Sequence, residues 1–137
     1  MRNLENKNII VTGASGGIGN AIIKKLYEAG ANILASGTRK EKLEELKKNF
    51  ENIKILKFDV SQSDKIEEFI ENATKDLGGN LDGIVNNAGI TQDNLAIRMS
   101  LDEWQKVINI NLTSTFLMSK FAIKKMLKNK SGKIVNI

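Results

Sequence analysis

The chain has 137 residues, of which 41% are hydrophobic and 27% are charged, with no cysteine, no histidine and a formal net charge of +5. This length suits one domain, residues 1–137, and the missing residue types exclude disulfides, Ser-His-Asp catalysis and zinc-type sites within it, so we expect no metal. The positive charge favours an anionic partner, such as nucleotide phosphates, an acidic protein or nucleic acid, although a solvated basic surface is the simpler explanation.

Short apolar runs alternate with amphipathic patterns along the chain. The runs predict strands at residues 8–12, 32–36, 53–59, 81–86 and 133–137. The longer patterns predict helices at residues 17–29, 40–50, 63–77 and 101–128. This alternation, with strands apolar enough to be buried on both faces, predicts an α/β fold with a doubly wound, Rossmann-like parallel sheet.

Helix boundaries carry their own signals. Gly30 follows the first helical pattern and Gly78-Gly79 follow the third, as helix ends favour. Three motifs match a capping box at a helix start. They are Thr38-x-x-Glu41, Ser61-x-x-Asp64 and Ser100-x-x-Glu103.

The last helical pattern, residues 101–128, is long for a globular helix and carries two apolar stripes. One stripe includes Trp104 and Ile108, and the other includes Val107 and Ile110. A helix that is apolar on two sides must be covered on two sides, so we expect the sheet on one side and more chain or another subunit on the other.

A glycine-rich turn lies between the first strand and the first helix. Glycines permit a tight turn and let a diphosphate approach the main chain, where amides at the helix start stabilise it. The spacing Gly-x-x-x-Gly-x-Gly differs from Gly-x-Gly-x-x-Gly, and no Walker-type Lys-Ser/Thr pair follows. We predict that a dinucleotide binds at Gly13, Ser15, Gly16, Gly17, Ile18 and Gly19.

The end of the second strand selects between the two nicotinamide dinucleotides. NAD enzymes of this architecture usually place a carboxylate there, but no acid occurs between Asn32 and Lys40. Arg39 can pair with a 2′-phosphate, and Thr38 precedes it, so we predict NADP(H). Thr38 could equally cap the next helix, and Arg39 could be solvated.

The fourth strand ends in Asn86-Asn87-Ala88-Gly89, about 70 residues after the glycine-rich turn. Ligands of open α/β sheets bind where the strand order reverses, at the carboxyl ends of the strands. With the expected order 3-2-1-4-5, that point lies between strands 1 and 4. We therefore predict that Asn87, Ala88 and Gly89 line the nicotinamide ribose.

These motifs carry a family resemblance. The run Thr12-Gly13-x-x-x-Gly17-x-Gly19 and the Asn-Asn-Ala-Gly motif resemble the short-chain dehydrogenase/reductase family. The later run Asp93-Asn94-Leu95, with Glu103-Trp104 and Asn111-Leu112, is similar to the 3-oxoacyl-[acyl-carrier-protein] reductases of bacterial fatty acid synthesis. The likeness covers the whole chain.

The resemblance implies roles for three further residues. Asp59 and Val60 are expected against the adenine ring, although Asp59 could instead cap a turn before Ser61. Asn111 is implied to be catalytic, holding a water that relays protons to a lysine. On its residue type alone, it would be read as an exposed helix asparagine.

The family pattern also includes catalytic residues that do not occur in this sequence. A catalytic Ser follows the fifth strand, and a Tyr-x-x-x-Lys motif comes later, but the only tyrosine here is Tyr27, with Ala31 four residues on. We therefore expect the N-terminal part of a longer reductase, truncated before a sixth strand and inactive by itself. The intact protein would reduce 3-oxoacyl-[acyl-carrier-protein] with NADPH as a homo-oligomer, a tetramer by resemblance.

Lysines are concentrated near the end of the chain. Acyl carrier protein is acidic, and by resemblance Lys130 is the best candidate for its contact, although a solvated helix end explains the group equally well. The lysines are Lys124, Lys125, Lys128, Lys130 and Lys133.

Two other classes of partner are not expected. No apolar run approaches the about 18 residues that cross a bilayer, and the polar N-terminus lacks a signal-peptide stretch, so we expect a cytoplasmic protein. Nucleic acid is disfavoured because no recognition motif accompanies the positive charge.

Two alternative functions stay open. One is a related dehydrogenase of a sugar, steroid or small alcohol, and the other is a non-catalytic nucleotide-binding module.

Overall fold

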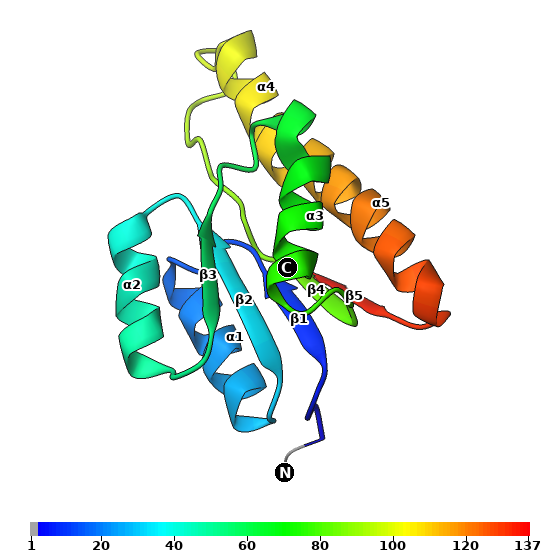
Figure 1. The fold of residues 1–137 in the computed structure, drawn as a ribbon. Coiled ribbons are helices and arrows are strands. Elements are labelled where there is room, and N and C mark those ends of the chain that lie inside the picture. Colours follow the sequence, from blue (N-terminus) through cyan, green and yellow to red (C-terminus); the bar gives the residue numbers. More distant parts are fainter. Residues whose placement is uncertain (1–2) are drawn as a thin grey trace.

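The computed structural model describes residues 3–137, which form a parallel five-stranded sheet with helices on both faces (Figure 1). The strand order β3-β2-β1-β4-β5 confirms the predicted doubly wound, Rossmann-like arrangement. All the neighbouring strands pair in parallel. The strands are β1 (Asn8–Val11), β2 (Asn32–Gly37), β3 (Lys54–Lys57), β4 (Gly83–Asn86) and β5 (Lys133–Asn136).

Helices cover both faces because the strand residues alternate between two apolar clusters. In β1, Ile9 and Val11 pack against the cluster that contains Ile23, whereas Ile10 packs against the cluster that contains Ile70. The first face carries α1 (Gly17–Glu28) and α2 (Lys40–Asn49). The second face is covered by α3 (Ile66–Asp76), η2 (Asn109–Thr113) and α5 (Ser114–Met126). The remaining helical elements are η1 (Ser63–Lys65), α4 (Leu101–Ile108) and η3 (Leu127–Asn129), which contribute no residue to this cluster.

The long helix predicted at residues 101–128 is not one regular α-helix. A π-helical turn, η2, separates α4 from α5, and α5 ends at Met126 before the 3₁₀ turn η3. The hydroxyls of Ser114 and Thr115 donate to the carbonyls of Ile110 and Asn111, four residues back. Such side-chain bonds compete with regular helix bonding, and a residue pattern does not separate a π turn from an α turn.

The predicted helix boundaries are confirmed in part. Ser100 accepts the amide of Glu103 at 3.1 Å and caps α4. Thr38 and Ser61, in contrast, are not the capping residues: Arg39 is the N-cap residue of α2 and Gln62 that of η1. The predicted glycine stops have positive φ angles, at Gly30 (92°), Gly78 (104°) and Gly79 (98°).

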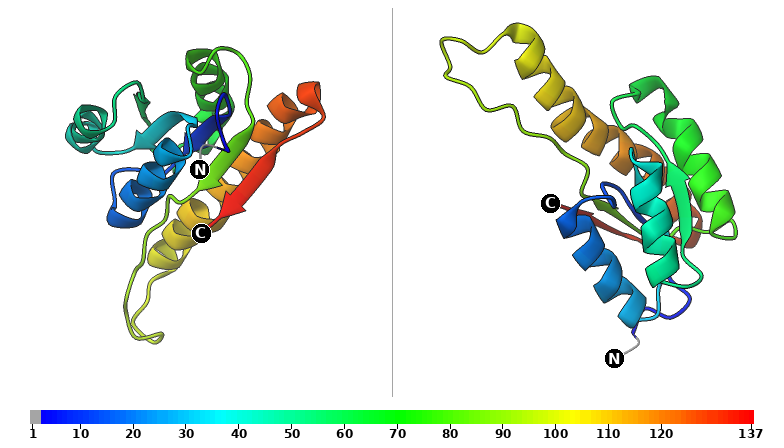
Figure 2. Two further views of the ribbon diagram at one scale, coloured as in Figure 1. Left: turned by 90° about the horizontal axis from the view of Figure 1, so that it is seen from below. Right: turned by 90° about the vertical axis from the view of Figure 1, so that its left-hand side faces the viewer.

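The segment between β4 and α4 runs away from the sheet and returns along α4, as the right-hand view of Figure 2 shows. Large apolar side chains on this segment and on α4 are exposed, among them Ile97 (92%), Leu101 and Trp104. The second side of the long helix therefore lacks cover within the described chain. None of the helices described for residues 3–137 is long and apolar enough to span a membrane.

Candidate functional site

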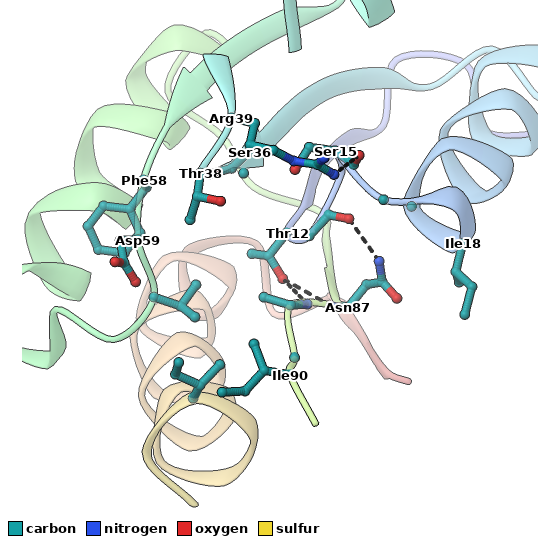
Figure 3. Close-up of a pocket in the computed structure, with 18 of the residues that line it drawn as sticks. Thr12, Ser15, Ile18, Ser36, Thr38, Arg39, Phe58, Asp59, Asn87 and Ile90 are labelled. Carbon is teal, nitrogen blue, oxygen red and sulfur yellow. Dashed lines mark hydrogen bonds between the residues drawn. The ribbon is translucent and has the colours of Figure 1, made fainter. Parts of the chain in front are cut away.

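A cleft of about 390 Å³ opens at the carboxyl ends of the strands, where β1 and β4 lie side by side (Figure 3). Residues from the turns after β1, β2, β3 and β4 meet in it. Every predicted cofactor-binding residue lines this cleft. These residues are Gly13, Ser15, Gly16, Gly17, Ile18, Gly19, Thr38, Arg39, Asp59, Val60, Asn87, Ala88 and Gly89.

The three motif glycines of the first turn differ in what a side chain at each position would meet. Gly13 has a φ of +63°, and a Cβ there would lie 2.7 Å from the carbonyl oxygen of Asn87. A Cβ on Gly19 would meet the carbonyl of Gly13 and lie 2.8 Å from Cα of Ala14. A Cβ on Gly17 would meet nothing within 4 Å, so packing does not require a glycine there. The open space at Gly17 is where a bound phosphate would approach the main chain.

The start of α1 offers unpaired amides to this space. Its N-cap, Gly16, has no side chain to accept a hydrogen bond. In the described part of the chain, the amides of Gly17, Ile18 and Gly19 donate to no backbone carbonyl, whereas that of Asn20 donates to Gly16. Free amides at a helix N-terminus stabilise an anion. The residues present therefore fit a dinucleotide diphosphate.

The turn after β2 closes one end of the cleft. The Arg39 guanidinium donates a 2.8 Å hydrogen bond to the carbonyl oxygen of Ser15, which links this turn to the glycine-rich turn. A Cβ on Gly37 would lie 2.7 Å from Oγ of Ser15, so a side chain does not fit at that close approach. A cation at the rim with no carboxylate among the lining residues of this turn suits a phosphate.

The turn after β3 supplies Phe58, Asp59 and Val60 to the cleft. A carboxylate oxygen of Asp59 accepts the amide of Ser61 at 2.9 Å, as expected if Asp59 caps this turn. The ring of Phe58 stacks on Phe69 of α3, with 4.5 Å between the centroids. Val60 is buried in the core, which anchors the turn to the sheet.

The turn after β4 is held to β1 by the side chain of Thr12, which is 2% exposed. Its hydroxyl oxygen accepts the amides of Asn87 and Ala88, each at 3.1 Å, and donates to the carbonyl of Val85 at 3.4 Å (Figure 3). The Asn87 side chain donates to the carbonyl of Gly13 at 3.1 Å. These bonds fix the two central turns of the cleft against each other.

The predicted catalytic residue, Asn111, lies in the π turn beside this cleft and does not line it. Its side-chain oxygen accepts the amide of Ile90, and its side-chain nitrogen donates to the carbonyl of Ile90, both at 2.8 Å. A Cβ on Gly89 would lie 3.1 Å from the Asn111 side-chain oxygen, so this position favours a small residue. Asn111 is exposed, as its residue type suggests, and it anchors the segment after Gly89.

Sequence reasoning missed several residues of the cleft. Thr12 and Gly37 were findable, because one is part of the glycine motif and the other is a glycine at a strand end. Phe58 and Ile110 gave no signal, since apolar residues beside a strand or in a helix are usually core. The missed lining residues are Thr12, Ser36, Gly37, Phe58, Ile90 and Ile110.

The lysine cluster is partly ion-paired. Lys125 lies 2.5 Å from a carboxylate oxygen of Glu71, and the Lys125 ammonium lowers the pKa of Glu71 below its ordinary value. Lys124 lies 3.7 Å from Glu67. These pairs join α3 to α5. Lys130 instead lies in the turn before β5, with a φ of 52°.

The fold and the cleft together define a doubly wound α/β protein of the Rossmann-like class. The model of the family described as short chain dehydrogenase matches residues 7–137. The chain therefore belongs to the short-chain dehydrogenase/reductase family of oxidoreductases.

Relatives support the same grouping. The 3-oxoacyl-[acyl-carrier-protein] reductase FabG of Rickettsia conorii is 42% identical over 100% of this chain and 55% of its own length, and Nodulation protein G of Rhizobium sp. is 40% identical over 100% and 56%. A crystal structure of a short-chain dehydrogenase/reductase from Brucella melitensis, described as a glucose/ribitol dehydrogenase, has a TM-score of 0.83 and 32% identity, covering 90% of this chain and 51% of its own. The chain spans about half the length of these proteins.

Proposed function

We propose that these residues are the nicotinamide-dinucleotide-binding part of an NADPH-dependent 3-oxoacyl-[acyl-carrier-protein] reductase. The single observation that carries the proposal is the meeting of three turns in one cleft: the glycine-rich turn, the Arg39 turn and the Asn87–Gly89 turn. 3-Oxoacyl-[acyl-carrier-protein] reductases from Rickettsia conorii and Aquifex aeolicus match 100% and 98% of this chain at 42% and 41% identity.

Each turn has a proposed task. The amides of Gly17, Ile18 and Gly19 hold the diphosphate, and Arg39 holds the 2′-phosphate that distinguishes NADP(H). Asp59 and Val60 line the adenine end. The cofactor would supply the hydride that reduces the keto carbon.

At the nicotinamide end, small residues let the ribose lie close to the main chain. Ala88 and Gly89 leave that space, and Thr12 fixes their backbone. Asn111 is the proposed catalytic residue of this part, where it would hold a water that relays protons to a lysine, and its two bonds to Ile90 fix the segment after Gly89. Since no Tyr-x-x-x-Lys motif occurs in these residues, we propose that they bind the cofactor without turnover.

The proposed partner of the whole protein is acyl carrier protein, which is acidic. Lys130 is the candidate contact, because it lies in an exposed turn and forms no ion pair among the described residues, whereas Lys124 and Lys125 do. The whole protein is proposed to be a cytoplasmic homo-tetramer, with the exposed apolar side chains of α4, such as Trp104, in subunit contacts.

Calorimetric titration of the chain with NADPH and with NADH tests the proposal. We expect saturable binding of NADPH and at least about tenfold weaker binding of NADH, since a charge-assisted bond to the 2′-phosphate contributes about 1.5–3 kcal/mol. Heat with neither dinucleotide would refute the assignment of the cleft.

A second candidate substrate is a sugar alcohol, because the similar Brucella structure is described as a glucose/ribitol dehydrogenase. Activity of the longer protein would decide between the two. Oxidation of NADPH by an acetoacetyl thioester favours the reductase, and reduction of NADP⁺ or NAD⁺ by ribitol favours the sugar dehydrogenase.

A further inference from the structure

Two asparagines of the π turn η2 reach opposite walls of the cleft. Asn111 forms its two 2.8 Å bonds with Ile90, on the wall formed by the turn after β4. Asn109 donates from its side-chain nitrogen to the carbonyl of Ser61 at 3.3 Å and accepts the hydroxyl of Ser63 at 3.3 Å. Ser61 and Ser63 belong to the wall formed by the turn after β3.

The geometry of a helix explains this division. Side chains two positions apart point to nearly opposite sides of a helix, about 200° apart in an α-helix and somewhat less in a π turn, so Asn109 and Asn111 face opposite sides. Ile110 lies between them and lines the cleft. The π turn therefore crosses the end of the cleft, with one asparagine on each wall and an apolar side chain in the middle.

The wall after β3 has few other anchors. Gln62 donates to Asp59, Ser63 donates to the carbonyl of Ser61, and Asp59 accepts Ser61, all within the turn. Apart from the bonds that the amides of Lys65 and Ile66 donate to the carbonyls of Gln62 and Ser63 next to them in the sequence, the described hydrogen bonds of residues 59–63 to elements distant in the sequence are those with Asn109. The other attachments of this wall are the burial of Val60 and, at its start, the Phe58 amide, which donates to the carbonyl of Gly37 at 3.0 Å, and the Phe58 ring, which stacks on Phe69. Asn109 is thus the polar side-chain tie that holds the Asp59–Val60 wall in place.

Asparagine is a poor choice for a helix interior because its amide competes with the main chain. Here both amides are used outside their own helix, which gives two such residues in one turn a physical purpose. Single π turns inside helices occur frequently at functional sites.

We propose that Asn109 and Asn111 form a brace that sets the separation of the two cleft walls, and that Asn109 is a positioning residue for the adenosine end of the bound dinucleotide. This inference rests on the proposed function. Asn109 touches no ligand in this scheme. It acts through Ser61 and Ser63, which fix Asp59 and Val60.

Hydrogen exchange of the free chain tests the brace without any cofactor. Asn109→Ala should accelerate the amide exchange of Gln62 and Ser63 by about fivefold, the factor that corresponds to the loss of a tie worth about 1 kcal/mol. Ile90 should keep its rate in this variant. Asn111→Ala should accelerate the exchange of the Ile90 amide and leave the rates of Gln62 and Ser63 unchanged. Unchanged rates at Gln62 and Ser63 in Asn109→Ala would overturn the brace.

Binding of adenosine 2′,5′-bisphosphate, which carries only the adenosine end, tests the positioning role. Asn109→Ala and Ser63→Ala should each weaken its affinity about three- to tenfold, the range expected for a lost hydrogen bond, and the double variant should lose no more than Asn109→Ala alone. The matched control is Asn72→Ala, an exposed helix asparagine of α3 with no described hydrogen bond, which should change nothing.

The two proposals fail in different ways. If the unaltered chain binds neither NADPH nor the bisphosphate, the proposed function is wrong, and the exchange rates alone decide whether the brace exists. If the unaltered chain binds both and Asn109→Ala binds as tightly, the positioning role is wrong while the proposed function stands. Equal weakening by Asn72→Ala would also overturn the positioning role.

Discussion

The guanidinium of Arg39 donates a 2.8 Å hydrogen bond to the main-chain carbonyl of Ser15, so the turn after β2 is tied to the glycine-rich turn after β1 (Figure 3). Gly37 lets Ser15 lie against the end of β2, since a Cβ there would lie 2.7 Å from Oγ of Ser15. The bond keeps a cation at the rim of the cleft, and none of the ion pairs found among residues 3–137 involves Arg39. That arrangement leads to the first prediction.

Arg39→Asp should reverse the cofactor preference. A carboxylate at this position repels a 2′-phosphate and can accept a ribose hydroxyl, so affinity for NADPH should fall at least about tenfold while that for NADH holds or rises. Titrations with both dinucleotides measure this. Lys48→Asp, the same charge change at the far end of α2, is the control and should leave the ratio of the two affinities unchanged. A parallel loss for both dinucleotides would contradict a specific role of Arg39.

Gly13→Ala and Gly17→Ala should have opposite consequences. An alanine at residue 13 would have to adopt a positive φ angle, and its methyl group would clash with the carbonyl of Asn87. We therefore expect the free energy of unfolding to fall by about 2–4 kcal/mol. At Gly17 the methyl meets nothing, so the fold should hold while NADPH binding weakens. Urea denaturation and calorimetry of both variants separate the effects. Equal stability of the two variants would contradict the geometry of the turn.

The parts that sequence predicts well depend on local periodicity and on glycine. The parallel, doubly wound arrangement follows from alternating apolar runs and right-handed crossovers, and once the order 3-2-1-4-5 of the dinucleotide-binding architecture is assumed, the cleft follows from where β1 and β4 end. Gly13 is required by its own backbone angle, so its role is visible in one motif. The position of Asn87 directly after a strand likewise predicts that it lines the cleft.

The parts that sequence predicts poorly depend on contacts between distant segments. Asn109 looks like an ordinary surface residue of a helix until Ser61 and Ser63, more than 40 positions earlier, are placed beside it. Thr38 matches a capping motif, yet the chain starts α2 after Arg39, whose side chain is used at Ser15. A local pattern does not reveal a competing partner elsewhere in the fold.

Thr12→Val should destabilise the protein, and Thr12→Ser should not. Valine keeps the shape of threonine but removes the oxygen that accepts the amides of Asn87 and Ala88. Two part-buried amides without an acceptor should reduce the free energy of unfolding by about 1–3 kcal/mol. Serine retains the oxygen and should lose less than half as much. Urea denaturation measures all three proteins, and equal stability of valine and threonine would show that the hydroxyl is dispensable.

The Glu71–Lys125 pair should make the stability of the α3–α5 layer depend on pH. Because the Lys125 ammonium lowers the pKa of Glu71 in the folded chain, the pair stabilises the fold fully above the ordinary pKa of 4.5, and this contribution is lost as the pH falls through the lowered folded pKa.

Replacing Lys125 by methionine removes the cation and keeps the apolar stem. Lys125→Met should therefore lower the urea midpoint at pH 7, and the difference from the unaltered chain should shrink below pH 4.5 as Glu71 gains a proton. Lys47→Met, at an exposed α2 position without a described ion pair, is the control and should show no such pH dependence. A difference that stays constant from pH 7 to about pH 3 would mean that the ion pair with Glu71 is not its source and would contradict the prediction.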